Sequence, residues 1–148
     1  MKFEELPVAL RYLRKSIKYW PIPVVTTISL KQSPFMVLVS CLLSLRTRDE
    51  TTYAASKRLF ALARSPKKLL DLNPQQVETA IYPVAFYRNK TINLFEICRS
   101  LVNENKGMVP DSLDKLIRLK GVGRKTANLT LVLGHNKLGV CVDIHVHR

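Results

Sequence analysis

The sequence contains few cysteines and no long apolar run, and each shortage excludes a class of protein. Three cysteines lie far apart at positions 41, 98 and 141, so they offer neither a disulfide framework nor the ligand spacing of a metal site. No segment reaches the roughly 18 uninterrupted apolar residues of a membrane span, and the N-terminus, with Glu4 and Glu5, lacks the form of a secretion signal. We expect a soluble, intracellular protein, in the cytoplasm or nucleoid of a prokaryote or the nucleus of a eukaryote.

Acidic residues are also scarce. The chain has 11 Asp plus Glu against 24 Lys plus Arg, which gives a formal net charge of +13 and an isoelectric point near 10.0. An excess of this size favours a polyanionic partner. Nucleic acid and an anionic membrane surface both meet that description, so charge alone leaves the choice between them open.

The period-two alternation of a half-buried strand is missing throughout, whereas helix start signals recur. A capping residue followed by proline is a strong start cue. Such pairs stand at Ser33-Pro34, Ser65-Pro66 and Asn73-Pro74. Residues 35–45 are apolar nearly all round, which predicts a central buried helix, and residues 47–50 fit a capping box led by Thr47. We predict an all-α fold in which residues 1–148 form one domain.

The segment 111–133 carries the most informative pattern. Apolar residues at helical intervals are followed by Gly121-Val122-Gly123, and a second helix is expected to begin at Arg124. Both glycines allow positive φ and close approach by a ligand, and unpaired amides at a helix N-terminus form an anion site. Arg124 and Lys125 add positive charge beside it. The pattern predicts a helix-hairpin-helix motif that binds phosphate.

Other segments of the chain accompany the hairpin. They are Ser33-Pro34-Phe35, Leu42-Leu43-Ser44-Leu45-Arg46-Thr47-Arg48-Asp49, Phe86-Tyr87-Arg88-Asn89-Lys90, Val109-Pro110 and Val142-Asp143-Ile144-His145. With these segments the chain resembles the endonuclease III branch of the helix-hairpin-helix DNA glycosylases over most of its length. The resemblance implies a base-excision repair glycosylase that removes oxidised pyrimidines and is also a lyase on abasic sites. Its partner would be double-stranded DNA with damaged bases or abasic sites, bound by a monomer without membrane contact.

The resemblance also implies the reacting groups, with Lys125 as nucleophile and Asp143 as its essential partner. A lysine amine can attack C1′ of the sugar, expel a damaged base and leave a Schiff base, after which β-elimination cleaves the strand. Asp143 would accept a proton or stabilise the positive charge that develops on the sugar. The competing interpretation is an ordinary N-cap of a helix that begins at Ile144, and the two roles are compatible.

Basic residues outside the hairpin are further candidate DNA contacts. Many relatives carry Gln in the loop occupied here by Leu45-Arg46, where a side chain enters the gap left by the flipped base. Arg46 is expected to fill this gap or to bind phosphate, and a solvated loop arginine is the competing interpretation. Arg88 and Lys90 are expected to contact backbone phosphate, although charges at a helix start are as often merely solvated. The predicted DNA-binding set is completed by Gly121, Val122, Gly123 and Arg124.

The end of the chain predicts a partial domain. Only five residues follow Asp143, too few for a stable isolated helix, so we expect a C-terminally truncated glycosylase. Members of the family usually continue with further helices and a four-cysteine iron-sulfur loop, so we predict no cofactor in this chain and place the 4Fe-4S ligands beyond Arg148. In this fold the N-terminal helix packs on those further helices. Its apolar stripe is therefore expected to be partly uncovered, at Leu10, Leu13, Ile17 and Trp20.

Two other functions remain open. One is a non-enzymatic helix-hairpin-helix DNA-binding fragment, in which Lys125 only contacts phosphate. The other is a single-function DNA glycosylase of the adenine-removing type, a class that lacks a lysine at the position of Lys125. The presence of Lys125 argues against the second function, and an activity assay is needed to separate the first.

Overall fold

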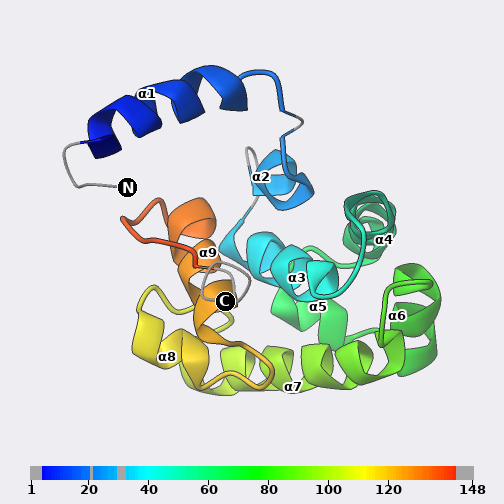
Figure 1. The fold of residues 1–148 in the computed structure, drawn as a ribbon. Coiled ribbons are helices and arrows are strands. Elements are labelled where there is room, and N and C mark those ends of the chain that lie inside the picture. Colours follow the sequence, from blue (N-terminus) through cyan, green and yellow to red (C-terminus); the bar gives the residue numbers. More distant parts are fainter. Residues whose placement is uncertain (1–4, 21, 30–32, 143–148) are drawn as a thin grey trace.

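The structure is a computed structural model that describes residues 5–20, 22–29 and 33–142. Across these residues it contains helices and no strand, so the predicted all-α fold is confirmed (Figure 1). The helices are α1 (Leu6–Ile17), α2 (Val24–Ser29), α3 (Pro34–Ser44), α4 (Asp49–Leu62), α5 (Pro66–Leu70), α6 (Pro74–Ile81), α7 (Tyr87–Asn105), α8 (Leu113–Ile117) and α9 (Arg124–Gly134). No helix in this part of the chain has the length and apolar character that crossing a bilayer requires.

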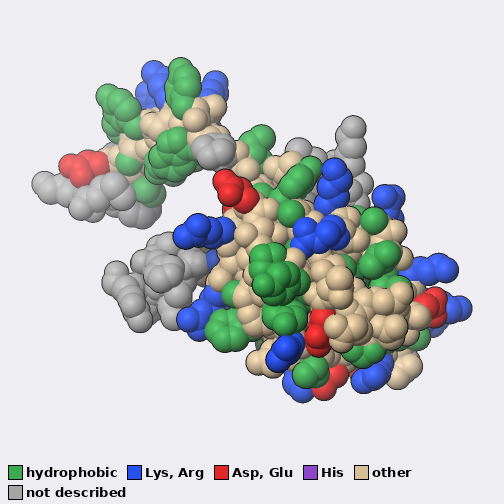
Figure 2. Space-filling model, turned by 90° about the vertical axis from the view of Figure 1, so that its right-hand side faces the viewer, with side chains coloured by type: hydrophobic (Ala, Val, Ile, Leu, Met, Phe, Trp, Pro, Cys, Tyr) green, Lys and Arg blue, Asp and Glu red, His purple; other side chains and the backbone are tan. Residues whose placement is uncertain are grey.

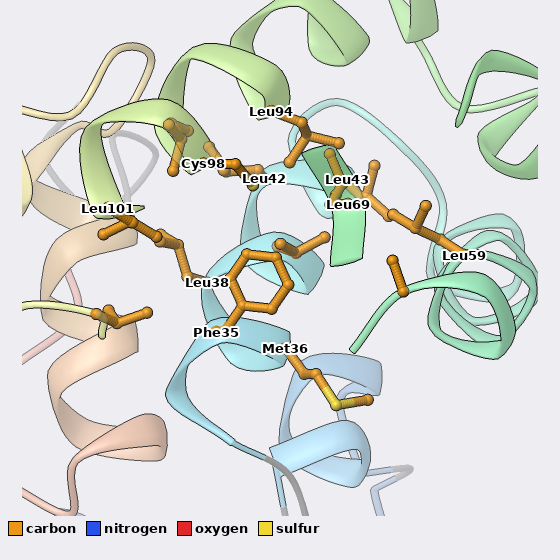
Figure 3. Close-up of a cluster of buried hydrophobic side chains, with 14 of the residues drawn as sticks. Phe35, Met36, Leu38, Leu42, Leu43, Leu59, Leu69, Leu94, Cys98 and Leu101 are labelled. Atoms are coloured by element: carbon orange, nitrogen blue, oxygen red, sulfur yellow. The ribbon is translucent and has the colours of Figure 1, made fainter. Parts of the chain in front are cut away.

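Helix α3 forms the centre of the core. All nine residues from Phe35 to Leu43 are buried, as the apolar run predicts. Figure 3 shows side chains of α3 facing Leu59 of α4, Leu69 of α5 and Leu94 of α7. Full burial of a large apolar side chain contributes about 1.5–3 kcal/mol. Helices α2, α4 and α9 pack directly on α3, whereas α5 packs on α7, α6 on α4 and α7, and α8 on α9.

The predicted helix starts are confirmed at all three serine-proline or asparagine-proline pairs. The Ser33 and Ser65 side chains each accept a hydrogen bond from a first-turn amide of their helix, and Asn73 forms a complete capping box with Gln76. The predicted capping box led by Thr47 is wrong. Helix α4 has Arg48 at its N-cap without a side-chain bond, because the Thr47 hydroxyl makes longer-range contacts instead.

Helices α3 and α9 pack against each other in antiparallel register. At one end Gly134 lies so close to Pro34 that an added Cβ would come within 3.1 Å of the proline Cα. Further along, the Cys41 thiol is within reach of the Thr130 hydroxyl and of the Lys125 charge. Residue numbers thus rise along α3 as they fall along α9. The register places the N-terminal end of α9 and the C-terminal end of α3 at the same end of the pair.

Helix α1 stands apart from the rest of the molecule (Figures 1 and 2) and has no buried residue. Its predicted apolar stripe is exposed, with 46% of Leu13 and 60% of Trp20 accessible to solvent. Figure 2 shows hydrophobic and basic side chains together on this helix. Unlike α3, helix α1 contributes no buried side chain to the core that positions the site.

Candidate nucleic-acid interface

The hairpin between α8 and α9 has the geometry that the glycine pair predicts. Two turns form, in which the Leu119 amide donates to the Leu116 carbonyl and the Val122 amide donates to the Leu119 carbonyl, both at 3.1 Å. Gly121 has φ +75°, which only glycine adopts readily. Gly123 has φ −86°, so of the two glycines only Gly121 uses the positive φ that glycine allows. The lack of a side chain at Gly123 serves a different purpose.

Gly123 is the N-cap of α9 and leaves the front of that helix open. It supplies no side-chain acceptor to the amides of the first turn, and a Cβ added at this position would meet nothing within 4 Å. Amides at a helix N-terminus attract anions through hydrogen bonding and through the helix dipole. An oxyanion can therefore approach the backbone closely here.

Val122 occupies a different position from the one expected of a DNA contact. Its side chain is only 5% exposed and joins the main core. Its amide is already used within the hairpin. Val122 therefore anchors the hairpin to the protein, while the flanking glycines and Arg124 stay exposed.

Lys125 lies in the first turn of α9 with an exposed side chain. Burial raises the pKa of the Cys41 thiol to about 12, and the nearby positive charge of Lys125 acts against that rise. Helices α3 and α9 pack in antiparallel register with Gly134 against Pro34, so Lys125, at the other end of α9, lies beside the C-terminal half of α3. Cys141 donates to the Lys125 carbonyl, with 3.7 Å between sulfur and oxygen.

The chain after α9 is tied back toward this helix. The Lys137 ammonium lies 2.7 Å from Asp111 Oδ2 and 2.6 Å from the Asp111 carbonyl oxygen, and this contact lowers the pKa of the Asp111 carboxyl. Further along this segment, Cys141 lies next to the first turn of α9, where it contacts the Lys125 carbonyl. Asp143, the predicted catalytic carboxylate, lies outside the described residues.

Helix α7 contacts the hairpin through two side chains, Glu96 and Asn93. The Lys120 ammonium is 2.7 Å from Glu96 Oε2 and 3.0 Å from Oε1. The Asn93 side chain lies against Gly121, where an added Cβ would come within 3.1 Å of its amide nitrogen. The ion pair is largely exposed, so it contributes about 0–1 kcal/mol. The close packing at Gly121 fixes the hairpin relative to α7.

The loop after α3 presents Arg46 on the surface. Arg46 has φ +57°, and its guanidinium carbon lies 5.2 Å from the ring centroid of Phe86. Phe86 is 58% exposed and also has a positive φ, of +56°. The sequence motif at 86–90 contains this phenylalanine, but its pairing with Arg46 joins residues forty positions apart, so no local pattern indicates it. Arg88 is exposed and lies over the Tyr87 ring.

Lys90 does not present its ammonium at the surface as a phosphate contact would. Its Nζ donates to the carbonyls of Leu43 and Leu45, at 2.8 and 2.7 Å, and to the Thr47 hydroxyl at 3.3 Å. Burial lowers the pKa of Lys90 to about 8, so the group is still protonated at pH 7. Three oxygens inside the protein thus take up the three N–H donors of the ammonium.

The described residues do not fit an iron-sulfur cluster. No group of three or more His, Cys, Asp or Glu residues is placed to hold a metal ion in the part of the chain that the structure describes. Cys41 and Cys98 are buried in different clusters of the core, and burial raises the pKa of each thiol to about 12. An iron-sulfur cluster is held by four cysteine thiolates, and these two cysteines are not grouped with further ligands among the described residues.

Comparison with known proteins agrees with this geometry. The model of the HhH-GPD superfamily of base excision DNA repair proteins matches residues 39–148. Endonuclease III of Thermotoga maritima is 49% identical over 115 residues, which cover 78% of this chain and 54% of that protein. Endonuclease III of Escherichia coli K12 is 35% identical over 116 residues, which cover 78% and 55%. The chain spans about half the length of the curated relatives it matches.

The solved structure described as "Structure of a Trapped Endonuclease III-DNA Covalent Intermediate: Estranged-Adenine Complex" has the same helical arrangement. It aligns with a TM-score of 0.86 and 28% sequence identity, over 99% of this chain and 66% of that chain. The match to the family model and the likeness to these relatives lead to one conclusion: the chain belongs to the HhH-GPD superfamily of base excision DNA repair proteins, within the endonuclease III family.

Proposed function

We propose that this chain carries the reaction centre of a DNA base-excision repair glycosylase with lyase activity on abasic sites, acting on oxidised pyrimidines. Family membership supports repair of DNA as the setting. The printed description of a related structure refers to a trapped covalent intermediate with DNA, which supports a covalent mechanism here. The proposal concerns the whole protein, because the chain spans about half of its relatives.

DNA binding begins at the hairpin in this proposal. A phosphate binds at the open N-terminus of α9, where it accepts hydrogen bonds from the backbone amides that follow the glycine hairpin. Arg124 and Arg88 are exposed and add further phosphate contacts. Such contacts hold the duplex in register without reading its sequence. The enzyme then turns the damaged nucleotide out of the stack, because the sugar carbon is otherwise out of reach, and Arg46 fills the gap.

The reaction is nucleophilic substitution at the sugar. The neutral Lys125 amine forms a bond to C1′ while the glycosidic C–N bond breaks, and the base leaves with the bonding electron pair and takes up a proton. The lysine nitrogen then loses a proton, and the C1′–O4′ bond of the sugar ring breaks as the C=N bond forms, while O4′ takes up a proton from solvent, which gives a protonated Schiff base. β-Elimination of the 3′ phosphate then cleaves the strand. Asp143 accepts a proton or stabilises the developing positive charge.

The observation that carries this proposal is the position of Lys125. The residue is exposed in the first turn of α9, directly behind the open glycine cap, at the end of the α3–α9 pair where the Arg46 loop also lies. A lysine that only contacted phosphate would not need this place beside the C-terminal half of α3. A single-function glycosylase would not need the lysine at all.

Borohydride trapping tests the nucleophile, because the reagent reduces a Schiff base to a stable bond. Wild-type protein should become covalently attached to DNA that contains an abasic site. Lys125→Gln should abolish this attachment and still bind the DNA. Lys120→Gln provides a matched control, since it removes a neighbouring lysine that is paired with Glu96, and it should be trapped like wild type. Equal trapping of Lys125→Gln and wild type would sink the assignment of Lys125.

A further inference from the structure

Lys90 is a lysine whose charge is directed into the protein. A half-buried ammonium is costly unless hydrogen bonds compensate it, and here three oxygens do so. Two of them are carbonyls at the C-terminal end of α3. Carbonyls at this end of a helix lack intrahelical donors, and the helix dipole makes them electronegative. Lys90 therefore binds the end of the central helix from the first turns of α7.

The third acceptor, Thr47, extends this contact to a second loop. Its hydroxyl donates to the Leu45 carbonyl at 3.3 Å and accepts from Lys90. It also accepts a hydrogen bond from the Ala85 amide at 3.2 Å. The loop that follows α3 and the loop that precedes α7 are thus joined at one point. Lys90 is the charged member of that junction.

The residues beside this junction are strained. Arg46 precedes Thr47 and Phe86 follows Ala85, and both have φ near +57°. The left-handed region costs a non-glycine residue about 1–2 kcal/mol, and such strain persists only where the surrounding structure holds it. The two strained residues form an exposed pair, in which the guanidinium of Arg46 lies against the ring of Phe86.

Helix α7 connects this pair to the hairpin. Lys90, Asn93 and Glu96 follow one another at intervals of three residues, so each is next to the following one on the helix surface, and all three lie within about 9 Å of rise. Asn93 packs against Gly121 and Glu96 pairs with Lys120. One rigid element therefore contacts both the Arg46 loop and the phosphate-binding hairpin.

We propose that Lys90 is a positioning residue that holds Arg46 and Phe86 at a fixed place relative to the hairpin, so that the pair enters the duplex while the hairpin holds its phosphates. This inference rests on the proposed function. It assigns Lys90 to the opening of the base stack and not to phosphate binding or bond breaking. Its contribution is needed only when a stacked base must leave the duplex.

Two substrates separate this role from catalysis. One is duplex DNA with thymine glycol opposite adenine, where the lesion must leave the stack. The other is a single strand with an abasic site, where no base has to move. Because misplacing a reacting group by about 1 Å costs up to about a hundredfold in rate, Lys90→Met should slow cleavage of the duplex lesion by at least about tenfold. Cleavage of the single strand should stay within about twofold of wild type on the same argument.

Matched variants keep the test falsifiable. Lys68→Met removes the same charge from an exposed site in α5 and should behave as wild type on both substrates. Thr47→Val removes the hydroxyl without removing a charge and should reproduce the Lys90→Met pattern, whereas Thr47→Ser should restore activity. Equal losses on both substrates, or no loss on the duplex, would overturn the proposal.

Hydrogen exchange on the protein alone provides a readout that does not depend on activity. Amides in loops 45–47 and 84–86 should exchange at least about tenfold faster in Lys90→Met and Thr47→Val than in wild type, because local opening then costs less free energy. Unchanged exchange in both loops would refute the positioning role. Failure of wild type to cleave either DNA would instead refute the proposed function, and the exchange measurement would still decide the role of Lys90.

Discussion

Lys125 and Asp143 stand eighteen positions apart in the sequence (143 minus 125), and the described chain between them folds back toward the lysine. The ion pair of Lys137 with Asp111 holds the segment after α9. Cys141 then contacts the Lys125 carbonyl. The last described residues before Asp143 therefore approach the proposed nucleophile, which supports a joint role for the two groups.

Replacing Asp143 by Asn distinguishes chemistry from helix capping. Asn is also a good N-cap and has nearly the same shape, so the variant should keep its circular dichroism spectrum and DNA affinity. The carboxylate charge and basicity are lost, and base release should fall by about two orders of magnitude or more. Single-turnover kinetics on a duplex lesion measure the effect.

The control for this variant is Asp114→Asn, which removes an exposed carboxylate from α8 in the helix-hairpin-helix motif. Its base release should match wild type. If Asp143→Asn also turns over at the wild-type rate, the carboxylate is structural and Lys125 has its proton acceptor elsewhere.

The hairpin acts as a unit in which two glycines do different work. Gly121 needs its positive φ and its close contact with Asn93. Gly123 has an ordinary φ and open space in front of it. A side chain at Gly121 would therefore disturb the protein, whereas a side chain at Gly123 would project into the space where a phosphate is proposed to bind.

Gly123→Leu is accordingly a specific test of the phosphate site. The variant should melt within a few degrees of wild type, because its side chain meets no protein atom at Cβ. Affinity for undamaged duplex at fixed salt should fall by about tenfold or more, since each hydrogen bond to a charged group contributes about 1.5–3 kcal/mol. The loss should be the same for unrelated sequences. An unchanged affinity would remove the hairpin from the DNA interface.

Over the whole molecule, the charge of +13 predicts binding that depends strongly on salt. Much of this charge lies away from the proposed interface, for example on the separate helix α1. Net charge therefore cannot say which basic residues touch DNA. The dependence of affinity on salt concentration counts the phosphates that are neutralised, so comparing it between wild type and a variant shows whether the replaced residue touches DNA.

Arg88 is the residue outside the hairpin best suited to that measurement. Arg88→Ala should reduce the slope of log affinity against log salt by about 0.9, the value for one phosphate contact. Lys106→Asn is the control, since it removes a charge at the opposite end of α7 and keeps a residue that tolerates the φ of +54° found there. Identical slopes for Arg88→Ala and the control would show that Arg88 is merely solvated.

The sequence by itself determined the helical elements and the hairpin. Ser33, Ser65 and Asn73 cap their helices as predicted, and Gly121 turns the hairpin with the expected positive φ. These features depend on residues within one or two turns of each other, so their physical causes are all visible in a short stretch of sequence. The resemblance carried by the motifs likewise indicated the family, which the comparisons confirm.

Only the tertiary structure decided which polar groups face the outside. The sequence predicts a phosphate contact for Lys90 at a helix start and a helix-capping role for Thr47. Both are instead committed to contacts with residues about forty positions away, as is Phe86 in its pairing with Arg46. Such contacts arise because α3 and α7 pack together and their ends expose unpaired carbonyls that need donors. The packing of α7 on α3 determines that Lys90 is the donor to these carbonyls. A local sequence pattern cannot predict this pairing.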